Sequence, residues 1–511
     1  MTSLHNSFRT RAAGNAARAF ICALLSGASL TACVSSSDIR SNAQLRTPDQ
    51  FSTSKSLTMQ GGDWPRIDWP AQVGGAALQT LVDEALADNP GLQVAASRLN
   101  AAAAAAEATR AAAGPTVVGA GTSTYQRYTE HGIVPPQLAG KRKLDTQLTL
   151  NFSYDFDFWG KHAAELRAVL AQGKAVQAEQ YSARLILAGA VAQSWLQLGR
   201  QSQQLRLAQR QLDARNTLNT LTQKRIAAGL DTQTDLQNGT QQIEMLRAEQ
   251  VQLQQAIAQS RNQLAALLGK GPDRGLLIEP PQMVSATSLQ LPTALPLELL
   301  GRRPDIVAAR WRVEAVQGEI DTARAQFYPN VNLNAFVGLS SFGLANLFTP
   351  GSLIAGVGPA FRLPIFEGGA LRAQLKGRIA SYDAAVASYN QTLTDALREV
   401  TDQMQSLQSA IDQRSHQQLA AEAAAQAVRL AEQRQRVGTG NRLQVLTAQA
   451  TLLQQQRIEL DSQLRIADAR LGLIKALGGG FDAQPAGLAL PIADGPSVKS
   501  SPLILPTKVA S

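Results

Sequence analysis

Residues 147–158, with the sequence QLTLNFSYDFDF, place apolar and polar side chains at alternate positions. Side chains alternate across a β-strand, so this stretch predicts a strand, expected over 144–158, with one apolar and one polar face. Asp155 and Asp157 would both lie on the polar face. A less regular alternation marks a second strand over 330–343, and candidate partner strands run over 116–128 and 353–366.

The four strands are best explained as part of a transmembrane β-barrel. Aromatic residues gather around them, and apolar-out, polar-in alternation between aromatic girdles is typical of such barrels. The alternative is a soluble sandwich with one face in a core. Barrels made from a single chain have at least about eight strands, and open edges in lipid leave backbone groups unsatisfied. Several copies of the chain must therefore combine.

The chain also contains an internal duplication. Gly229 and Gly269 recur 209 residues later as Gly438 and Gly478, and Arg225-Ile-Ala-Ala-Gly229 is matched by Arg436-Val-Gly438. We expect a first copy over 76–269 and a second over 301–478, joined by a linker over 270–300. Each copy reads as a helix, two strands and a long helical hairpin.

The hairpins are expected over 161–268 and 369–477, with their turns near Gly229 and Gly438. Apolar residues at alternating spacings of three and four predict coiled-coil packing. In the first hairpin these are Ile243, Leu246, Leu253, Ile257, Leu264 and Leu267. In the second they are Leu446, Ala450, Leu453, Leu460, Leu464, Ala467, Leu471 and Ile474, with Arg457 as the exception. A helix from 161 to 228 would be about 100 Å long, so the turns would form the tip of a rod.

The N-terminus reads as an export signal over residues 1–32, with a basic start and a short apolar run. It ends in Leu30-Thr31-Ala32-Cys33, which resembles the bacterial lipobox and predicts lipidation of Cys33. The alternative is an ordinary cleavage site beside a chance cysteine. The residue after the cysteine is Val34. In bacterial lipoproteins an aspartate at this position commonly retains the protein in the inner membrane, so its absence resembles the pattern of lipoproteins sorted to the outer membrane. We expect an extended segment over 33–75 and a tail over 479–511 to wrap the middle of the rod.

Composition and motifs argue against an enzyme or a nucleic-acid binder. The formal charge of +9 falls to +6 without the three signal-peptide arginines, and the basic residues form no aromatic-interleaved patch. The mature histidines, His131, His162 and His416, are scattered, and no metal, cofactor or nucleophile motif occurs. Asp155 and Asp157 could in principle form a catalytic pair of carboxylates. The alternating strand makes it much more favoured that they are polar residues facing the lumen of the barrel.

Three segments carry a family resemblance: Leu300-Gly-Arg-Arg-Pro304-Asp305, Ala323-Arg-Ala-Gln-Phe327-Tyr328-Pro329, and 358–369, GPAFRLPIFEGG. They resemble the TolC-type outer-membrane efflux proteins, especially their NodT-type lipoprotein branch. The resemblance implies a homotrimer with a 12-stranded β-barrel and a periplasmic α-barrel. It also implies a passive conduit for drugs or aromatic and amphipathic toxicants. A periplasmic adaptor would link it to an inner-membrane pump of the resistance–nodulation–division or major-facilitator type.

The resemblance also assigns roles to residues near the tips. The candidates for adaptor docking are Arg225, Gly229, Leu230, Arg436, Val437 and Gly438. Asp235 matches an acid at the periplasmic gate. The second hairpin departs from the family pattern, because Gln444 and Thr447 stand where many members carry acids, so we expect weaker cation binding and more polar or steric closure. The competing functions are a periplasmic coiled-coil adaptor or scaffold lipoprotein and an exported hydrolase.

Overall fold

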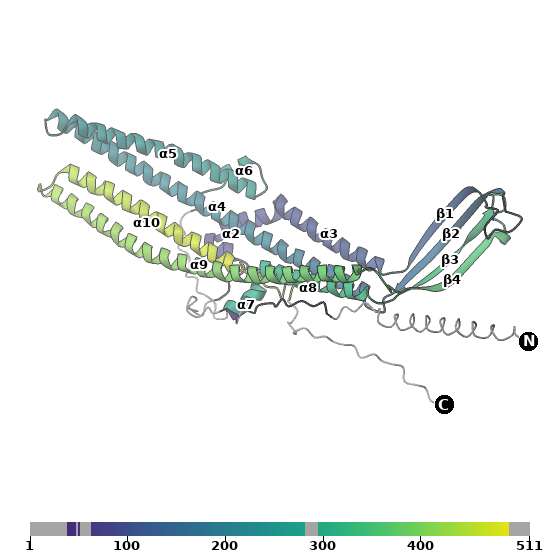
Figure 1. The fold of residues 1–511 in the computed structure, drawn as a ribbon. Helices are drawn as coiled ribbons and strands as arrows, with labels where there is room; N and C mark the ends of the chain where they lie inside the picture. Colours follow the sequence, from purple (N-terminus) through teal and green to yellow (C-terminus); the bar gives the residue numbers. More distant parts are fainter. Residues whose placement is uncertain (1–37, 48–49, 52–62, 282–294, 490–511) are drawn as a thin grey trace, which may run out of the picture.

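The computed structural model describes residues 38–47, 50–51, 63–281 and 295–489. The predicted signal peptide (residues 1–32), the predicted lipidation site Cys33 and the tail beyond 489 lie outside these ranges. The chain is elongated, with a β-sheet at one end and two helical hairpins reaching away from it to the other (Figure 1). Among the described helices, none combines the length and the apolar character that crossing a membrane would need.

The sheet has four antiparallel strands in the order β1 (Thr116–Arg127), β2 (Arg142–Phe156), β3 (Asn330–Phe342) and β4 (Leu353–Arg362). A short 3-10 turn, η2 (Pro350–Ser352), precedes β4. The central pair, β2 and β3, joins the two halves of the chain.

All four strands end earlier than the sequence predicts, β1 and β3 by one residue and β2 and β4 by two and four. β2 stops at Phe156 rather than at residue 158, because the Asp157 carboxylate accepts the backbone N–H groups of His162 (3.1 Å) and Ala163 (2.9 Å) and so turns the chain into a helix. β4 stops at Arg362 rather than at residue 366. Pro364 follows closely and has no N–H to donate to a strand ladder.

The helices repeat the same order in both halves. α3 (Pro90–Ala112), β1, β2, α4 (Lys161–Ala227) and α5 (Gln233–Leu267) are followed in the second half by α8 (Pro304–Ala325), β3, β4, α9 (Ala370–Arg436) and α10 (Arg442–Ala476). α4 and α9 each have 67 residues, and α5 and α10 each have 35. The heptad positions named above are buried or half-buried along both hairpins.

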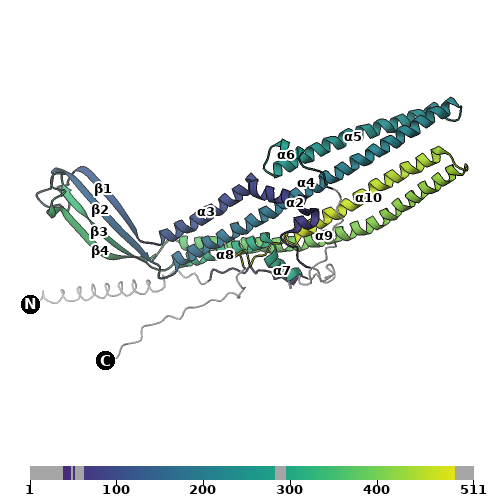
Figure 2. The ribbon, with the colours of Figure 1, turned by 180° about the vertical axis from the view of Figure 1, so that it is seen from behind.

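Helix also appears where an extended segment or a linker was expected. α2 (Trp69–Asp88) begins inside the segment 33–75, which was predicted to be extended. Pro70 suits a first helical turn, where its missing N–H is not needed, and Gly75 interrupts the helix with a φ of 66°. α6 (Pro272–Leu276) forms within the expected linker, and α7 (Leu295–Arg302) begins in it and ends two residues beyond it. Figure 2 shows α2, α6 and α7 beside the middle of the long helices.

The apolar core lies in this middle region. One cluster joins α8, α9 and α10 around Ile306, Leu393 and Leu473. A second joins α2, α4, α5 and α10 around Leu78 and Leu198. The tail packs here too, since Trp311 of α8 donates its indole N–H to the backbone oxygen of Leu488 (3.1 Å).

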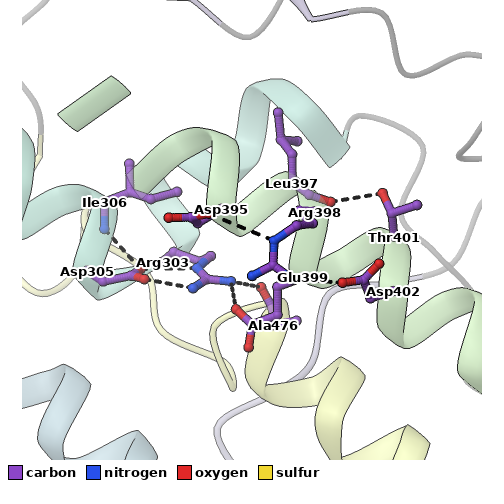
Figure 3. Close-up of polar contacts among 10 residues, drawn as sticks. All are labelled: Arg303, Asp305, Ile306, Asp395, Leu397, Arg398, Glu399, Thr401, Asp402 and Ala476. Atoms are coloured by element: carbon purple, nitrogen blue, oxygen red, sulfur yellow. Dashed lines mark hydrogen bonds and ion pairs between the residues drawn. The ribbon is translucent and has the colours of Figure 1, made fainter. Parts of the chain in front are cut away.

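Arg303 holds three helices together at the edge of this core (Figure 3). Its guanidinium donates to both carboxylate oxygens of Asp305 (3.1 and 2.7 Å), to Glu399 of α9 (2.8 Å) and to the backbone oxygen of Ala476 in α10 (3.0 Å). Burial alone would lower the pKa of Arg303, but the hydrogen bonds and charges of Asp305 and Glu399 outweigh burial and raise it. The arginine therefore stays charged in a nearly buried position.

Candidate functional site: sheet faces and hairpin tips

The strand register sorts the side chains of the sheet onto two faces. One face carries three apolar or small-residue rows across all four strands: Val117, Phe152, Ala335 and Val357; Gly119, Leu150, Val337 and Ala355; and Gly121, Leu148, Leu339 and Leu353. The other face is mainly polar and includes Thr149, Asn151, Ser153, Asn332 and Asn334. Phe336 is an exception on the polar face. It lies over Gly356, where an added Cβ would be 2.6 Å from its ring.

The two aspartates predicted to face the lumen from one strand take different positions. Asp155 lies on the polar face and contacts the ring Nε2 of His162 (3.0 Å) and the side-chain amide of Asn330 (3.1 Å). Asp157 lies beyond the end of β2, where it bonds the first turn of α4. Asp157 is therefore not a strand residue, and the prediction for it is wrong. The partners His162 and Asn330 were missed because they lie on other elements.

The first tip, residues 228–232, connects α4 to α5. Gly229 adopts a φ of 74° there, and Leu230, 64% exposed, donates its N–H to the backbone oxygen of Arg225 (2.8 Å). The Arg225 guanidinium forms two hydrogen bonds with the Asp231 carboxylate (2.8 and 2.9 Å), which raise the pKa of Arg225. The docking candidate Arg225 is thus already paired, and Leu230 is the exposed apolar group of this tip.

The second tip, residues 437–441, has the same backbone frame but different charges. Gly438 has a φ of 76°, and Thr439 donates its N–H to the backbone oxygen of Arg434 (2.9 Å). Arg434, not Arg436, is therefore the structural counterpart of Arg225. Gly440 occupies the position of Asp231, so among the described residues no carboxylate pairs with Arg434 or Arg436. Val437 is 72% exposed.

The gate candidates Asp235 and Gln444 are equivalent helix-capping residues. Asp235 forms a reciprocal capping box with Thr232, and Gln444 forms one with Asn441. Hydrogen bonds from the Thr232 side chain and backbone lower the pKa of Asp235. Thr447 lies one turn further along α10 and donates its hydroxyl to the backbone oxygen of Leu443 (2.9 Å). The same cap is therefore charged at one tip and neutral at the other.

This difference predicts that acid loosens only the first tip. Because the folded pKa of Asp235 lies below its ordinary 3.8, its capping contribution is complete above that pH and is lost as the pH falls through the lowered value. Hydrogen-exchange protection of the first turn of α5 should therefore fall in strong acid, while that of α10, capped by Gln444, should hold. Asp235→Asn should reproduce the loss at neutral pH. Equal losses at both tips would contradict the assignment.

Comparison with known proteins agrees with this architecture. The profile of the family described as "Outer membrane efflux protein" matches the chain twice, over residues 81–270 and 295–479. The multidrug resistance outer membrane protein MdtP of Escherichia coli K12 is 29% identical over 481 residues, covering 92% of this chain and 98% of that protein. Outer membrane protein OprJ of Pseudomonas aeruginosa is 30% identical over 428 residues, covering 83% and 88%.

Solved structures show the same fold. The outer membrane protein VceC from Vibrio cholerae superimposes with a TM-score of 0.74 and 37% identity, covering 82% of this chain and all of that one. The two family matches confirm the internal duplication. The predicted class, long helical hairpins of an α-barrel joined to four strands of a transmembrane β-barrel, is confirmed by this likeness. The protein is therefore located in the outer membrane, with its helices in the periplasm. It belongs to the outer membrane efflux protein family and is an outer-membrane efflux channel.

Proposed function

We propose that three copies of the chain form the channel, closing one 12-stranded barrel and one helical tunnel. The observation that carries this proposal is a four-stranded sheet with an apolar face and two outer strands, β1 and β4, that each pair on one side only. Unpaired backbone groups in lipid cost several kcal/mol each, so each edge requires a strand from another copy. The polar face then lines the lumen.

The channel conducts small molecules passively and catalyses no reaction. Related proteins are named for multidrug resistance and for fusaric acid resistance, which favours drugs and aromatic or amphipathic toxicants as cargo. An inner-membrane pump of the resistance–nodulation–division or major-facilitator type supplies the energy, and a periplasmic adaptor connects pump and channel. Acylation of Cys33 adds a lipid anchor.

Conductance in planar bilayers tests this function directly. The purified full-length protein should migrate as a trimer and form discrete ion-conducting channels. Divalent cations should block it weakly, since Gln444 and Thr447 replace acids. A water-soluble protein without conductance would favour an adaptor or scaffold instead. Strong divalent block abolished by Gln444→Ala would contradict the proposed gate.

The exposed apolar residues at the tips are the proposed docking points for the adaptor, with the unpaired arginines of the second tip facing acidic side chains. Leu230→Asp and Val437→Asp should each weaken crosslinking to the cognate adaptor about tenfold and lower dye efflux from cells, because a charge cannot be buried there without a partner. Bilayer conductance should not change. Leu276→Asp, at an equally exposed leucine of α6, is the control. Efflux lost equally in that control would argue against docking at the tips.

A polar contact between the two hairpins supports closure without an acidic ring. Arg457, the exception in the second heptad pattern, lies on α10 and pairs with Glu249 of α5 (2.6 Å), with both side chains half-buried. Arg457→Ala should raise the resting conductance of the channel severalfold, because it releases α10 from α5. Arg247→Ala breaks an exposed pair within α5 and should leave the conductance unchanged. Equal conductance in the two variants would exclude a gating role for Arg457.

A further inference from the structure

Basic residues gather at the end of the sheet that lies farthest from the helices. Lys141, Arg142 and Lys143 are exposed and follow one another at the start of β2, beside the β1–β2 turn at the far end of the molecule (Figure 1). Residues 330–361, which form β3, its connection to β4 and all of β4 except its last residue, Arg362, contain no charged side chain. The charge at this end of the sheet therefore comes from the β1–β2 hairpin alone.

The strand register places two arginines directly opposite each other on the apolar side of this hairpin. Arg127 pairs with Arg142, and the next pair on the same face is Tyr125 with Leu144. Like charges at such positions destabilise a sheet unless an anion compensates them. Glu130 bonds Arg127 (2.7 Å). Arg142 forms no ion pair with any residue in the described ranges.

The height of these residues can be estimated from the apolar face. From Leu144 to Phe156, a span that includes one row of hydroxyl side chains (Ser123, Thr146 and Ser341), β2 advances about 3.3 Å per residue, and with a tilt of about 40° this gives a height of about 30 Å. That height is the thickness of the hydrocarbon core of a bilayer. Tyr125, 68% exposed, lies at its outer boundary, where tyrosine is commonly found. Arg142 is one pair further out, at the level of the lipid headgroups.

We infer that Arg142, with Arg127 opposite it, binds the phosphate group of a lipid in the outer leaflet. A guanidinium can donate two parallel hydrogen bonds to a phosphate, and the lipid phosphate supplies the anion that Arg142 lacks. Lys141 and Lys143, one residue to either side of Arg142, project from the opposite face and take no part. The inference rests on the position of the sheet in the membrane and is independent of what the channel conducts.

Native mass spectrometry of the full-length protein in detergent tests the site, with palmitoyl-oleoyl phosphatidic acid as the probe and the matching phosphatidylcholine as the uncharged reference. Each basic side chain contributes about fivefold to the binding of an anionic lipid. Arg142→Gln should therefore weaken phosphatidic acid binding about fivefold. Lys143→Gln, the matched control, should change it little.

The inference would be overturned by unchanged lipid affinity in Arg142→Gln or by an equal loss in Lys143→Gln. It would also be overturned if inorganic phosphate, but not chloride at the same ionic strength, displaced the lipid, which would assign the site to free phosphate. Bilayer conductance separates this question from the channel function. A protein that binds the lipid but does not conduct contradicts the proposed function, whereas one that conducts but shows no lipid preference contradicts this inference.

Discussion

Arg303→Ala is expected to destabilise the folded chain by about 3 kcal/mol or more, the cost typical of removing one partner from a buried ion pair. The substitution removes the donor that joins Asp305, Glu399 and the end of α10, and it leaves the backbone oxygen of Ala476 without this partner. The three helices at the edge of the core should then separate at a lower temperature. Circular dichroism during thermal unfolding, with gel analysis of the assembled protein, measures the change.

The matched control lies on the same helix as Glu399. Arg398 pairs with Asp395 and Asp402 within α9, and its side chain is 66% exposed (Figure 3). Exposed pairs of this kind contribute at most about 1 kcal/mol, so Arg398→Ala should unfold close to the wild-type temperature. If both variants lost stability equally, the special role of Arg303 would be wrong.

Leu150→Arg is the second substitution with a large expected effect. Leu150 lies in the middle of the apolar face of β2, and an arginine facing lipid near the midplane of a bilayer costs about 2–4 kcal/mol. The cost applies to every copy in the proposed trimer, so little assembled channel should reach the outer membrane. Fractionation of cells and heat-modifiable migration on gels measure this loss.

The neighbouring residue provides the comparison. Asn151 points to the polar face, so Asn151→Arg should assemble normally and change only the ion selectivity of the channel. Assembly that fails equally in both variants would contradict the assignment of faces. Normal assembly of Leu150→Arg would show that this face does not contact lipid.

The sequence identified the sheet because the alternation of β2 is a local pattern that survives into the three-dimensional structure. Leu148, Leu150 and Phe152 lie together on the apolar face, as predicted. The helix from Trp69 was missed because its first turns contain Pro70, Gly74 and Gly75, which resemble a loop in sequence.

The site was predicted less completely, because its contacts join residues that no periodicity relates. Arg225 bonds Asp231 across a turn, and Asp157 serves as a cap although it continues the alternation of the strand. Matching residue types gave Arg436 as the counterpart of Arg225, whereas the backbone hydrogen bonds give Arg434. Such pairings depend on the conformation of the turn, which composition and spacing do not specify.

The equal lengths of the paired helices have a consequence for how such a chain can change. α4 and α9 have the same number of residues, as do α5 and α10. The two hairpins of a chain therefore reach equally far toward the inner membrane. Deleting one heptad from both helices of a single hairpin would shorten that hairpin by about 10 Å. The two tips of each chain would then lie at different distances from the inner membrane. A matching deletion in the other hairpin would bring the two tips back to the same distance, on a shorter helical tunnel.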